Sequence, residues 1–436
     1  MRIFFVKNRV VVVIFPLLLL SQQSLALEFS SSLSSETLYT NNSGLKSTSK
    51  LDDIVQTTGL NMTIKEDRKN FQTDASISLQ SENYFNNTFT DTTSLTTGLG
   101  VLNFDIIESF LNWNTYFSRR EVLKDTDDLD TPDNREFRNI LRTGPVITYA
   151  ISRYSTLGLS ANYINVENSN DEVSDAEKVS GSVSYSYLYN PLTLFKVSSD
   201  YEGVIDGDGD DEYDDVSFNA GFTRKIVNGE IEFRFTRSQL ELENSELETT
   251  DTYYFTMSRN HLFFHDFLFV YEQEIADSST GFDDGGLDTS AGPAGTVTQN
   301  AVLKRDQASL DVSRTMGSYS YSINGFWEKE GVLASIGTLS AKRRDKSRGG
   351  SLRIEQQFSP FLTLGFGVEY EINDFVGRPE IGKDIRNNYN FDTAYTVSED
   401  LSLNAYVRYE IRSNDQNSTR EYEEFATGFG LEWRLF

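Results

Sequence analysis

The stretch "SYSYSINGFWEKE", from Ser318 to Glu330, decides the fold because two kinds of residue alternate along it. One set of alternate positions is apolar or aromatic and holds Tyr319, Tyr321, Ile323, Gly325 and Trp327. The other set is mostly polar and holds Ser320, Ser322, Asn324, Phe326 and Glu328. A period of two predicts an extended strand with one apolar face. The opposite face is too polar to line a protein core.

The same alternation recurs from about Lys50 to Phe436, for example in "DLSLNAYVRYEIR", which runs from Asp400 to Arg412. The alternating segments are roughly 12 to 16 residues long, well beyond the ~5–6 residues of an ordinary strand. Each is long enough for a tilted transmembrane strand, which needs ~9–11 residues. Aromatic residues gather toward the segment ends. The two aromatic girdles of a membrane barrel would lie there.

The connectors between these segments alternate between tight and long. An up-and-down meander across a membrane produces this alternation, with short periplasmic turns and long external loops. Several tight connectors contain Asn-Pro, Asn-Gly or Ser-Pro, which favour turns. The tight connectors are Arg153-Tyr154, Asn190-Pro191, Asn228-Gly229, His261 to Phe264, Met316-Gly317, Ser359-Pro360 and Glu399-Asp400, and the long ones include Leu123 to Asn134, Ser169 to Asp175, Asp206 to Asp215, Ser278 to Gln299 and Asn373 to Asp384.

These patterns predict an all-β protein: a transmembrane, up-and-down, antiparallel β-barrel of the Gram-negative outer membrane, with residues 27–436 as its single domain. If the C-terminus is periplasmic, counting back through every connector shows that the strand near Asp52 to Lys65 runs from the external side of the membrane to the periplasmic side. An even strand count then requires one more strand before it, and the alternating "LEFSSSLSSETLYT", Leu27 to Thr40, can serve. The count is about 20 strands, or about 18 if the first hairpin lies outside the wall.

The first residues, "MRIFFVKNRVVVVIFPLLLLSQQSLALEF", combine a basic start, an apolar run from Val10 to Leu20 and small residues ending at Ala26. This order is typical of a secretory signal peptide. The apolar run of about 11 residues is shorter than the ~20 that a spanning helix needs. We therefore expect residues 1–26 to be a signal peptide, with an uncleaved anchor as the alternative interpretation.

The composition excludes several classes of function. The chain has 66 acidic and 39 basic residues, a formal net charge of −27. A nucleic-acid partner would require a basic face. The negative charge also argues against adhesion to anionic lipid headgroups unless divalent cations intervene. Because the chain has no cysteine, it can form neither disulfides nor thiolate zinc sites, and we expect no cofactor.

The acidic stretch "IDGDGDDEYDD", Ile205 to Asp215, resembles the start of a calcium-binding loop, with Asp206, Asp208 and Asp210 at every second position. The rest of the calcium pattern fails, because its sixth position holds Asp211 instead of glycine and its twelfth holds Ser217 instead of glutamate. We interpret the stretch as a solvated external loop. The alternative is loose binding of divalent cations that bridge to lipopolysaccharide phosphates.

The two histidines, His261 and His265, are the only imidazoles and straddle a predicted turn in "RNHLFFHDF". On a helix this spacing would suit a metal ion, but strands place the two rings differently. Asp266 beside His265 suggests an acid–base pair, yet the predicted turn lies on the periplasmic side, away from where barrel hydrolases carry such pairs. We predict interfacial histidines, no catalytic residues and no enzymatic activity.

The polar faces of several predicted strands carry charges of both signs. Interleaved arginine and glutamate on neighbouring strands would pair across the inner wall and rigidify it. An exporter of acidic polysaccharide should instead show a lumen dominated by arginine. The predicted lumen-lining residues are Glu230, Glu232, Arg234, Arg353, Glu355, Glu369, Glu371, Arg408, Glu410, Arg412, Glu432 and Arg434.

The C-terminus, "ATGFGLEWRLF", predicts the closing strand and its membrane-insertion signal. Bacterial outer-membrane barrels resemble it: their last strand alternates apolar residues and ends on an aromatic residue that the barrel-assembly machinery reads. Here the terminal residue is one position out of phase with the preceding apolar face. An ordinary edge strand that happens to end in Phe is the alternative. The predicted signal consists of Phe429, Leu431, Trp433, Leu435 and Phe436.

The hairpins "RTGPVITYAISRYSTLGLSANY" (Arg142 to Tyr163) and "SPFLTLGFGVEYE" (Ser359 to Glu371) resemble the outer-membrane β-barrel porins of exopolysaccharide loci, the family associated with exosortase and PEP-CTERM systems. The resemblance implies a role in exopolysaccharide or surface-protein export, and it carries over no catalytic residue. Expected partners are outer-membrane lipid and lipopolysaccharide, the barrel-assembly machinery, and exopolysaccharide or its export proteins.

Two classes of function stay open at this point. The first is a porin-like or export-associated channel that passes small solutes or a glycan through the lumen. The second is a structural or binding barrel without conductance, which holds polymer or partners with its acidic external loops. The sequence does not fix the radius of the lumen or the cargo.

Overall fold

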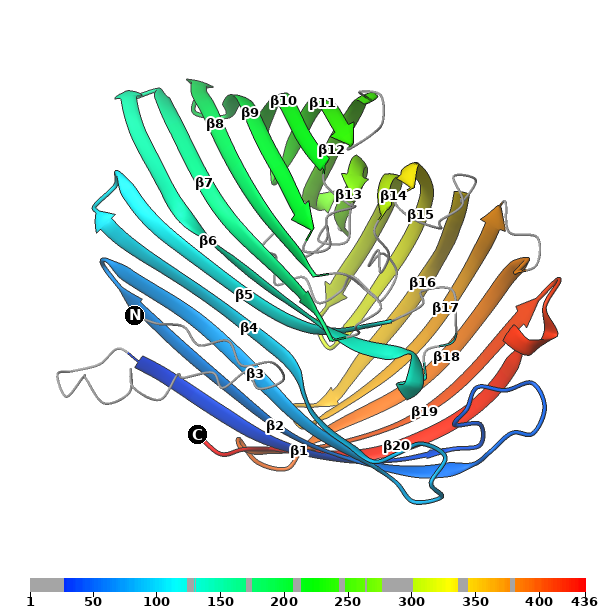
Figure 1. Ribbon diagram of the computed structural model, residues 1–436. Helices are drawn as coiled ribbons and strands as arrows, with labels where there is room; N and C mark the ends of the chain where they lie inside the picture. Colours follow the sequence, from blue (N-terminus) through cyan, green and yellow to red (C-terminus); the bar gives the residue numbers. More distant parts are fainter. Residues whose placement is uncertain are drawn as a thin grey trace.

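The computed structural model describes residues 27–123, 129, 131–169, 175–206, 213–242, 248–262, 265–276, 301–335, 344–376 and 381–436. These residues form a single sheet of 20 antiparallel strands that closes on itself (Figure 1). Each strand pairs with its neighbours in the sequence, and β1 also pairs with β20. The predicted all-β, up-and-down barrel is therefore confirmed, with the higher of the two strand counts.

The strands are long and similar in length. In chain order they are β1 Leu27–Thr40, β2 Asp53–Arg68, β3 Phe71–Tyr84, β4 Thr92–Ile107, β5 Leu111–Leu123, β6 Arg135–Ser152, β7 Ser155–Asn168, β8 Ala176–Asn190, β9 Thr193–Asp206, β10 Tyr213–Ile226, β11 Gly229–Leu242, β12 Glu248–Leu262, β13 His265–Ala276, β14 Ala301–Met316, β15 Tyr319–Ser335, β16 Arg344–Ser359, β17 Leu362–Val376, β18 Lys383–Thr396, β19 Leu401–Asn414 and β20 Tyr422–Arg434.

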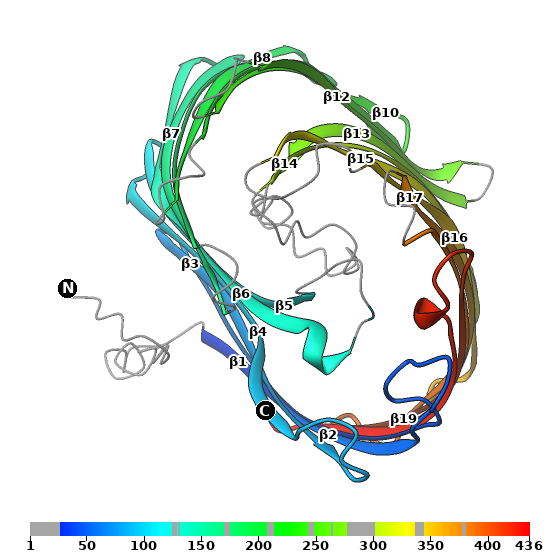
Figure 2. The same cartoon turned by 45° about the vertical axis from the view of Figure 1, so that its right-hand side comes forward.

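In the described parts of the connectors there are two single-turn 3₁₀ helices: η2 (Pro132–Asn134) precedes β6, and η3 (Ser418–Arg420) precedes β20. Both lie on the inner side of the ring in Figure 2. No helix within the described ranges is both long and apolar enough to cross a membrane.

The barrel closes through a seam between β1 and β20. The ladder runs from the pair Ser32–Arg434 to the pair Thr40–Ala426. At its far end the Thr40 hydroxyl donates to Glu424 Oε1 at 2.8 Å. β1 also pairs with β2 along its whole length, so the first hairpin belongs to the wall and the 18-strand alternative is wrong.

The connectors alternate as the sequence indicates, and most boundaries agree within one or two residues. The tight turn at Asn228 has a positive φ of 55°, which Asn-Gly turns favour. The predicted long connector from Asn373 to Asp384 is wrong in its bounds, because these two residues are themselves a cross-strand pair of β17 and β18. Strand pairing continues past the apolar residues there, so alternation of hydrophobicity underestimates the strand length.

The two faces of each strand differ in chemistry. The outer face carries apolar and aromatic side chains that remain exposed, such as Ile323 at 48% and Leu310 at 39%. The inner face carries serine, asparagine and charged side chains, such as Ser320 and Asn324 on β15. A soluble barrel would reverse this arrangement. The exposed apolar band therefore indicates apolar surroundings on the outside.

The inner side chains pack most closely in the half of the barrel that carries the long connectors. A small apolar cluster of Val122, Ile140, Ile164 and Val166 lies there on β5, β6 and β7. Arg138 on the same face is fully buried. The barrel therefore has a filled half near the long connectors and a more open half near the tight turns.

Candidate functional site

The inner wall brings together the twelve residues that the sequence assigned to a lumen. The cross-strand register places all of them on the face opposite the exposed apolar side chains. On β11, for example, Glu232 and Arg234 alternate with Phe233, whose ring packs 6.1 Å from Phe222 on the outer face. The shared face follows from the period of two. Their role in lining an open passage stays a prediction.

One ion-pair cluster centres on Arg386 of β18. Its Nε donates to Glu410 Oε1 at 2.8 Å and its Nη2 donates to Glu410 Oε2 at 3.1 Å. Glu371 on β17 lies 3.9 Å from the same guanidinium. Glu410 is 3% exposed and also accepts a hydrogen bond from the Tyr422 hydroxyl. A bidentate pair of this kind fixes both side chains against the wall.

A second cluster centres on Asp384, which is 2% exposed at the start of β18. Its carboxylate pairs with Arg412 of β19 and with Arg420 of η3, the latter at 2.8 Å. Asn414 donates a further hydrogen bond to it. Arg420 also lies over the ring of Phe375, with its guanidinium carbon 5.2 Å from the ring centroid. These contacts hold the connector before β20 against the inner wall.

Arg353 and Arg408 each have their own carboxylates. Arg353 Nε donates to Glu355 Oε1 at 2.8 Å, and its Nη2 lies 3.1 Å from Asp392 Oδ2. Arg408 Nη2 lies 2.8 Å from Glu424 Oε2. The predicted compensation of arginine by acidic residues is thus present, although the partners Asp392, Glu424 and Arg386 were not among the predicted residues.

The sequence prediction also missed a cluster around Arg305 of β14, which is 6% exposed. Its guanidinium lies 2.8 Å from Glu330, 3.1 Å from Glu274 and 3.7 Å from Glu328. The register places Arg305 directly between Glu274 and Glu330 on the neighbouring strands. Alternation alone does not reveal which strands are level with each other, so this cluster could be found only with the register.

Five of the predicted residues form no ion pair with any other described residue. They sit on the inner face without a carboxylate or cation within 4.0 Å, and they therefore add local charge to the wall. These residues are Glu230, Glu232, Glu369, Glu432 and Arg434.

Glycines flatten the inner wall where β17 meets β18 and where β19 meets β20. At each of four glycines, a side chain from the facing strand occupies the place of the missing Cβ. These side chains lie along the wall instead of standing into the interior, which widens the space enclosed. The pairs are Gly365 with Asp392, Gly367 with Asn390, Gly428 with Tyr406 and Gly430 with Asn404.

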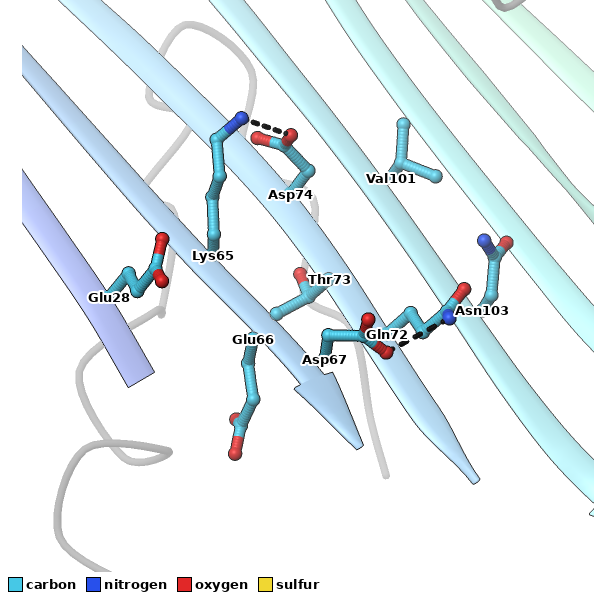
Figure 3. A pocket seen from close by; sticks show the side chains of 9 residues that line it. All are labelled: Glu28, Lys65, Glu66, Asp67, Gln72, Thr73, Asp74, Val101 and Asn103. Atoms are coloured by element: carbon cyan, nitrogen blue, oxygen red, sulfur yellow. Dashed lines mark hydrogen bonds and ion pairs between the residues drawn. The ribbon is translucent and has the colours of Figure 1, made fainter. Parts of the chain in front are cut away.

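A recess of about 460 Å³ lies at the tight-turn end of β1 to β4 (Figure 3). The Lys65 amine pairs with Asp74 at 2.9 Å, and Gln72 donates to Asp67 at 3.0 Å. Glu28 and Glu66 add two further carboxylates. The recess is polar, acidic and open to solvent, as expected for the hydrated mouth of a barrel.

Comparisons with known proteins agree with this geometry. Residues 337–433, which include most of β16 to β20, match the family model described as "Putative outer membrane beta-barrel porin, MtrB/PioB". No curated protein matches the chain. The apoprotein form of the FrpB iron transporter from Neisseria meningitidis (F5-1 variant) is 8% identical over 93% of this chain and 81% of that one, with a TM-score of 0.51. The siderophore receptor PirA from Pseudomonas aeruginosa is 11% identical over 94% and 81%, with a TM-score of 0.47.

This chain is an outer-membrane β-barrel protein. The matched family model and the exposed apolar band on the outer face support the same conclusion. At 8% identity the likeness to the FrpB structure shows the fold alone.

The two histidines of this outer-membrane barrel have structural contacts. His261 adopts a positive φ of 60° at the end of β12, and its backbone N–H donates to Asp266 Oδ1 at 3.1 Å. His265 contacts the Tyr321 hydroxyl, and their rings lie 5.8 Å apart. Asp266 therefore closes the turn between β12 and β13. The interfacial position of the two histidines stays a prediction. The absence of catalytic residues stays a prediction.

Two sequence predictions fall partly or wholly outside the described residues. The predicted signal peptide, residues 1–26, lies outside them, as do Asp208 and Asp210 of the weak metal candidate. Asp206 is the last residue of β9, where only the backbone is described. Within the described ranges, no group of three or more His, Cys, Asp or Glu side chains is arranged to hold a metal ion.

The terminal residues of the predicted insertion signal lie against β1. Phe429, Leu431 and Trp433 share the outer face of β20 and are exposed. The backbone carbonyl of Phe436 accepts a hydrogen bond from Ser31, and its ring centroid lies 6.3 Å from that of Phe29. Phe436 thus joins the outer apolar face despite being out of phase in the sequence. The recognition of this segment by the assembly machinery stays a prediction.

Proposed function

We propose that this protein is a porin-like channel for polar solutes with weak ion selectivity. The observation that carries the proposal is the compensation of charge on the inner wall: Arg305, Arg353, Arg386 and Arg408 each have a carboxylate within 3.1 Å. Paired charges produce a weak net field across an open lumen. A passage with a weak field discriminates little between cations and anions.

The uncharged part of the inner wall supports passage of hydroxyl-rich molecules. β8 presents a row of serines to the interior, and β15 continues the same chemistry with serine and asparagine. Such side chains offer both donors and acceptors of hydrogen bonds. The row on β8 consists of Ser180, Ser182, Ser184 and Ser186.

The finer proposal is a link to the export of exopolysaccharide or surface proteins, which rests on the resemblance of the hairpins to barrels of exopolysaccharide loci. The inner wall is compatible with a neutral or cationic glycan. It suits a polyanion poorly, because three carboxylates surround Arg305 and because four of the five predicted lumen residues without an ion pair are glutamates.

A planar-bilayer recording in a salt gradient tests the channel. Wild-type protein should conduct with a small reversal potential on the cation-selective side, because four of the five predicted lumen residues without an ion pair are glutamates. Changing Glu371→Gln and Glu410→Gln together removes both carboxylates within 4 Å of Arg386. The reversal potential should then move toward that of an anion-selective pore.

The matched control removes two carboxylates from the outer face, by Asp251→Asn and Glu423→Gln. Both residues pair with outward cations, Arg237 and Lys50. The control should leave the reversal potential unchanged. Strong anion selectivity in the wild type would contradict the compensated wall and favour a polyanion exporter.

The second candidate is a closed barrel that binds polymer or partners at its external loops without conductance. The inward anchoring of η3 through Arg420 and Asp384 favours it, because this contact narrows the long-connector half. No resolvable conductance from wild-type or variant protein, with the barrel folded, would reject the channel and support this alternative.

A further inference from the structure

The outer face of β14, β15 and β16 carries cations at a level where the surface changes from apolar to polar. These strands lie in the yellow to gold part of the wall in Figure 1. On β15, the outward residues from Tyr319 to Trp327 fill the ~9–11 positions that cross the hydrocarbon. The next outward residue is Lys329. It therefore lies just beyond the apolar band.

The register places Lys329 directly opposite Lys346 of β16. Like charges that face each other across two strands destabilise the pair. Lys329 forms a long ion pair, at 3.9 Å, with Asp306, which lies directly opposite it on β14. Lys346 is exposed and forms no ion pair with a described residue. Asp374 of β17 lies opposite Lys346 on its other side, so the two lysines together face two carboxylates.

Arg348 extends this surface by one outward position toward the apolar band. It lies opposite Trp327, is exposed, and likewise pairs with no described carboxylate. Trp327 is itself 39% exposed. An exposed tryptophan is typical of the level where acyl chains meet headgroups. We call Lys329, Lys346 and Arg348 the basic patch.

There is open space beside the basic patch. Gly331 follows Lys329 on the same face of β15 and lies opposite Lys304 of β14. A Cβ atom placed on Gly331 would meet nothing within 4 Å. A group from outside the protein therefore has room to lie beside the backbone of Gly331, next to Lys329 in the strand.

Two outward cations on other strands form closer ion pairs. Arg237 of β11 lies 2.9 Å from Asp251 of β12, and Arg135 lies 3.5 Å from Glu121. The three cations of the basic patch face two carboxylates, Asp306 and Asp374, so the patch keeps a local positive excess in a chain with a net charge of −27. An external anion can neutralise this excess. The position of the patch on the outer face, beside the lipid, indicates an anion that is itself part of the membrane.

We propose that the basic patch binds the phosphate groups of a phosphorylated glycolipid in the outer leaflet. The patch lies at the long-connector end of β15, which is the external end in outer-membrane barrels. Lysine and arginine together bind phosphate through charge-assisted hydrogen bonds. The acyl chains of the glycolipid would lie along the apolar residues below Trp327, which include Ile323 and Leu352.

Native mass spectrometry of the purified, folded protein in detergent can test this proposal by titration with bisphosphorylated lipid A. The triple variant Lys329→Gln, Lys346→Gln and Arg348→Gln should bind it roughly 100-fold more weakly, at about fivefold for each cation removed. The matched control Arg237→Gln removes an outward cation that already has a partner. Its affinity should equal that of the wild type.

Binding of two further ligands, dephosphorylated lipid A and inorganic phosphate, shows whether the patch recognises a lipid phosphate or a free anion. Dephosphorylated lipid A should bind the wild type as weakly as intact lipid A binds the triple variant, and equal binding of both lipids by the wild type would overturn the proposal. Inorganic phosphate should bind far more weakly than lipid A. Equal affinity would show that the patch takes a free anion and not a lipid.

A single variant keeps the test decisive if the triple variant does not fold. Lys346→Gln alone should weaken the binding of lipid A about fivefold. An unchanged affinity in this variant, or an equal loss in the Arg237→Gln control, would overturn the assignment of the site.

Discussion

The variant Gly144→Ala is expected to yield almost no folded barrel. Gly144 and Pro145 lie in the middle of β6, where the ladder with β7 passes from the pair Thr143–Tyr163 to the pair Val146–Ser160. Between these pairs, a Cβ atom on residue 144 would overlap the carbonyl oxygen of Ala161 and lie 2.8 Å from its carbonyl carbon. Both atoms belong to the backbone, so no side-chain rotation can relieve the overlap.

The expected cost is large because the two strands must separate to accept the methyl group. Overpacking against movable side chains already costs about 1–3 kcal/mol. A displaced strand would in addition lose ladder hydrogen bonds, and unpaired backbone groups are poorly tolerated in lipid. We therefore expect the heat-resistant compact form on unheated gels to disappear.

The control for this experiment is Gly325→Ala on β15. A Cβ atom there would meet nothing within 4 Å, and the glycine has no positive φ. Alanine at such a site should change stability by less than about 1 kcal/mol. A normal yield of folded Gly144→Ala protein would show that the close approach of β6 and β7 is not required.

The variant Asp384→Asn should lower the stability of the folded barrel by about 3–5 kcal/mol. The amide keeps the shape of the carboxylate but leaves Arg412 and Arg420 without their shared negative charge. Arg420 is 8% exposed, so water cannot replace the lost partner well. Urea unfolding in lipid vesicles measures the loss, and limited proteolysis between β19 and β20 should become faster.

An exposed ion pair provides the comparison for the buried ion pairs of Asp384. Lys69 and Glu108 lie 3.0 Å apart on two tight turns, with 75% and 60% of their side chains exposed. Because solvent screens such a pair, Glu108→Gln should change stability by less than about 1 kcal/mol. If Asp384→Asn had no larger effect than Glu108→Gln, the inward anchoring of η3 would contribute little to stability.

Much of the fold follows from the sequence because every strand of a membrane barrel alternates outward apolar residues with inward polar ones. The alternation around Ile323 predicts the two faces of β15, and tight turns such as Asn228-Gly229 mark the strand ends. The strand ends near the long connectors were less predictable. Beyond the apolar band both faces are polar, and the pairing of Asn373 with Asp384 leaves no trace in the hydrophobic pattern.

For the candidate site, the sequence predicted which charged residues share the inner face but not which of them form ion pairs with each other. The sequence assigns Glu410 and Arg412 to one face, and the register confirms that they share it. Their partners depend on the stagger between strands: Glu410 binds Arg386, and Arg412 binds Asp384. The stagger is a property of the closed barrel as a whole. One sequence therefore reveals the composition of the wall but not its ion pairs.

The seam between β1 and β20 has a consequence for the order of folding. One side-chain hydrogen bond that crosses it joins Thr40 to Glu424, residues separated by 384 positions. Contacts between residues so distant in sequence form slowly. Until the last strand has been exported, the edge of β1 stays available to other chains, which favours aggregation. The rate-limiting step of biogenesis should therefore be ring closure, and a catalyst that holds the β1 edge would accelerate it most.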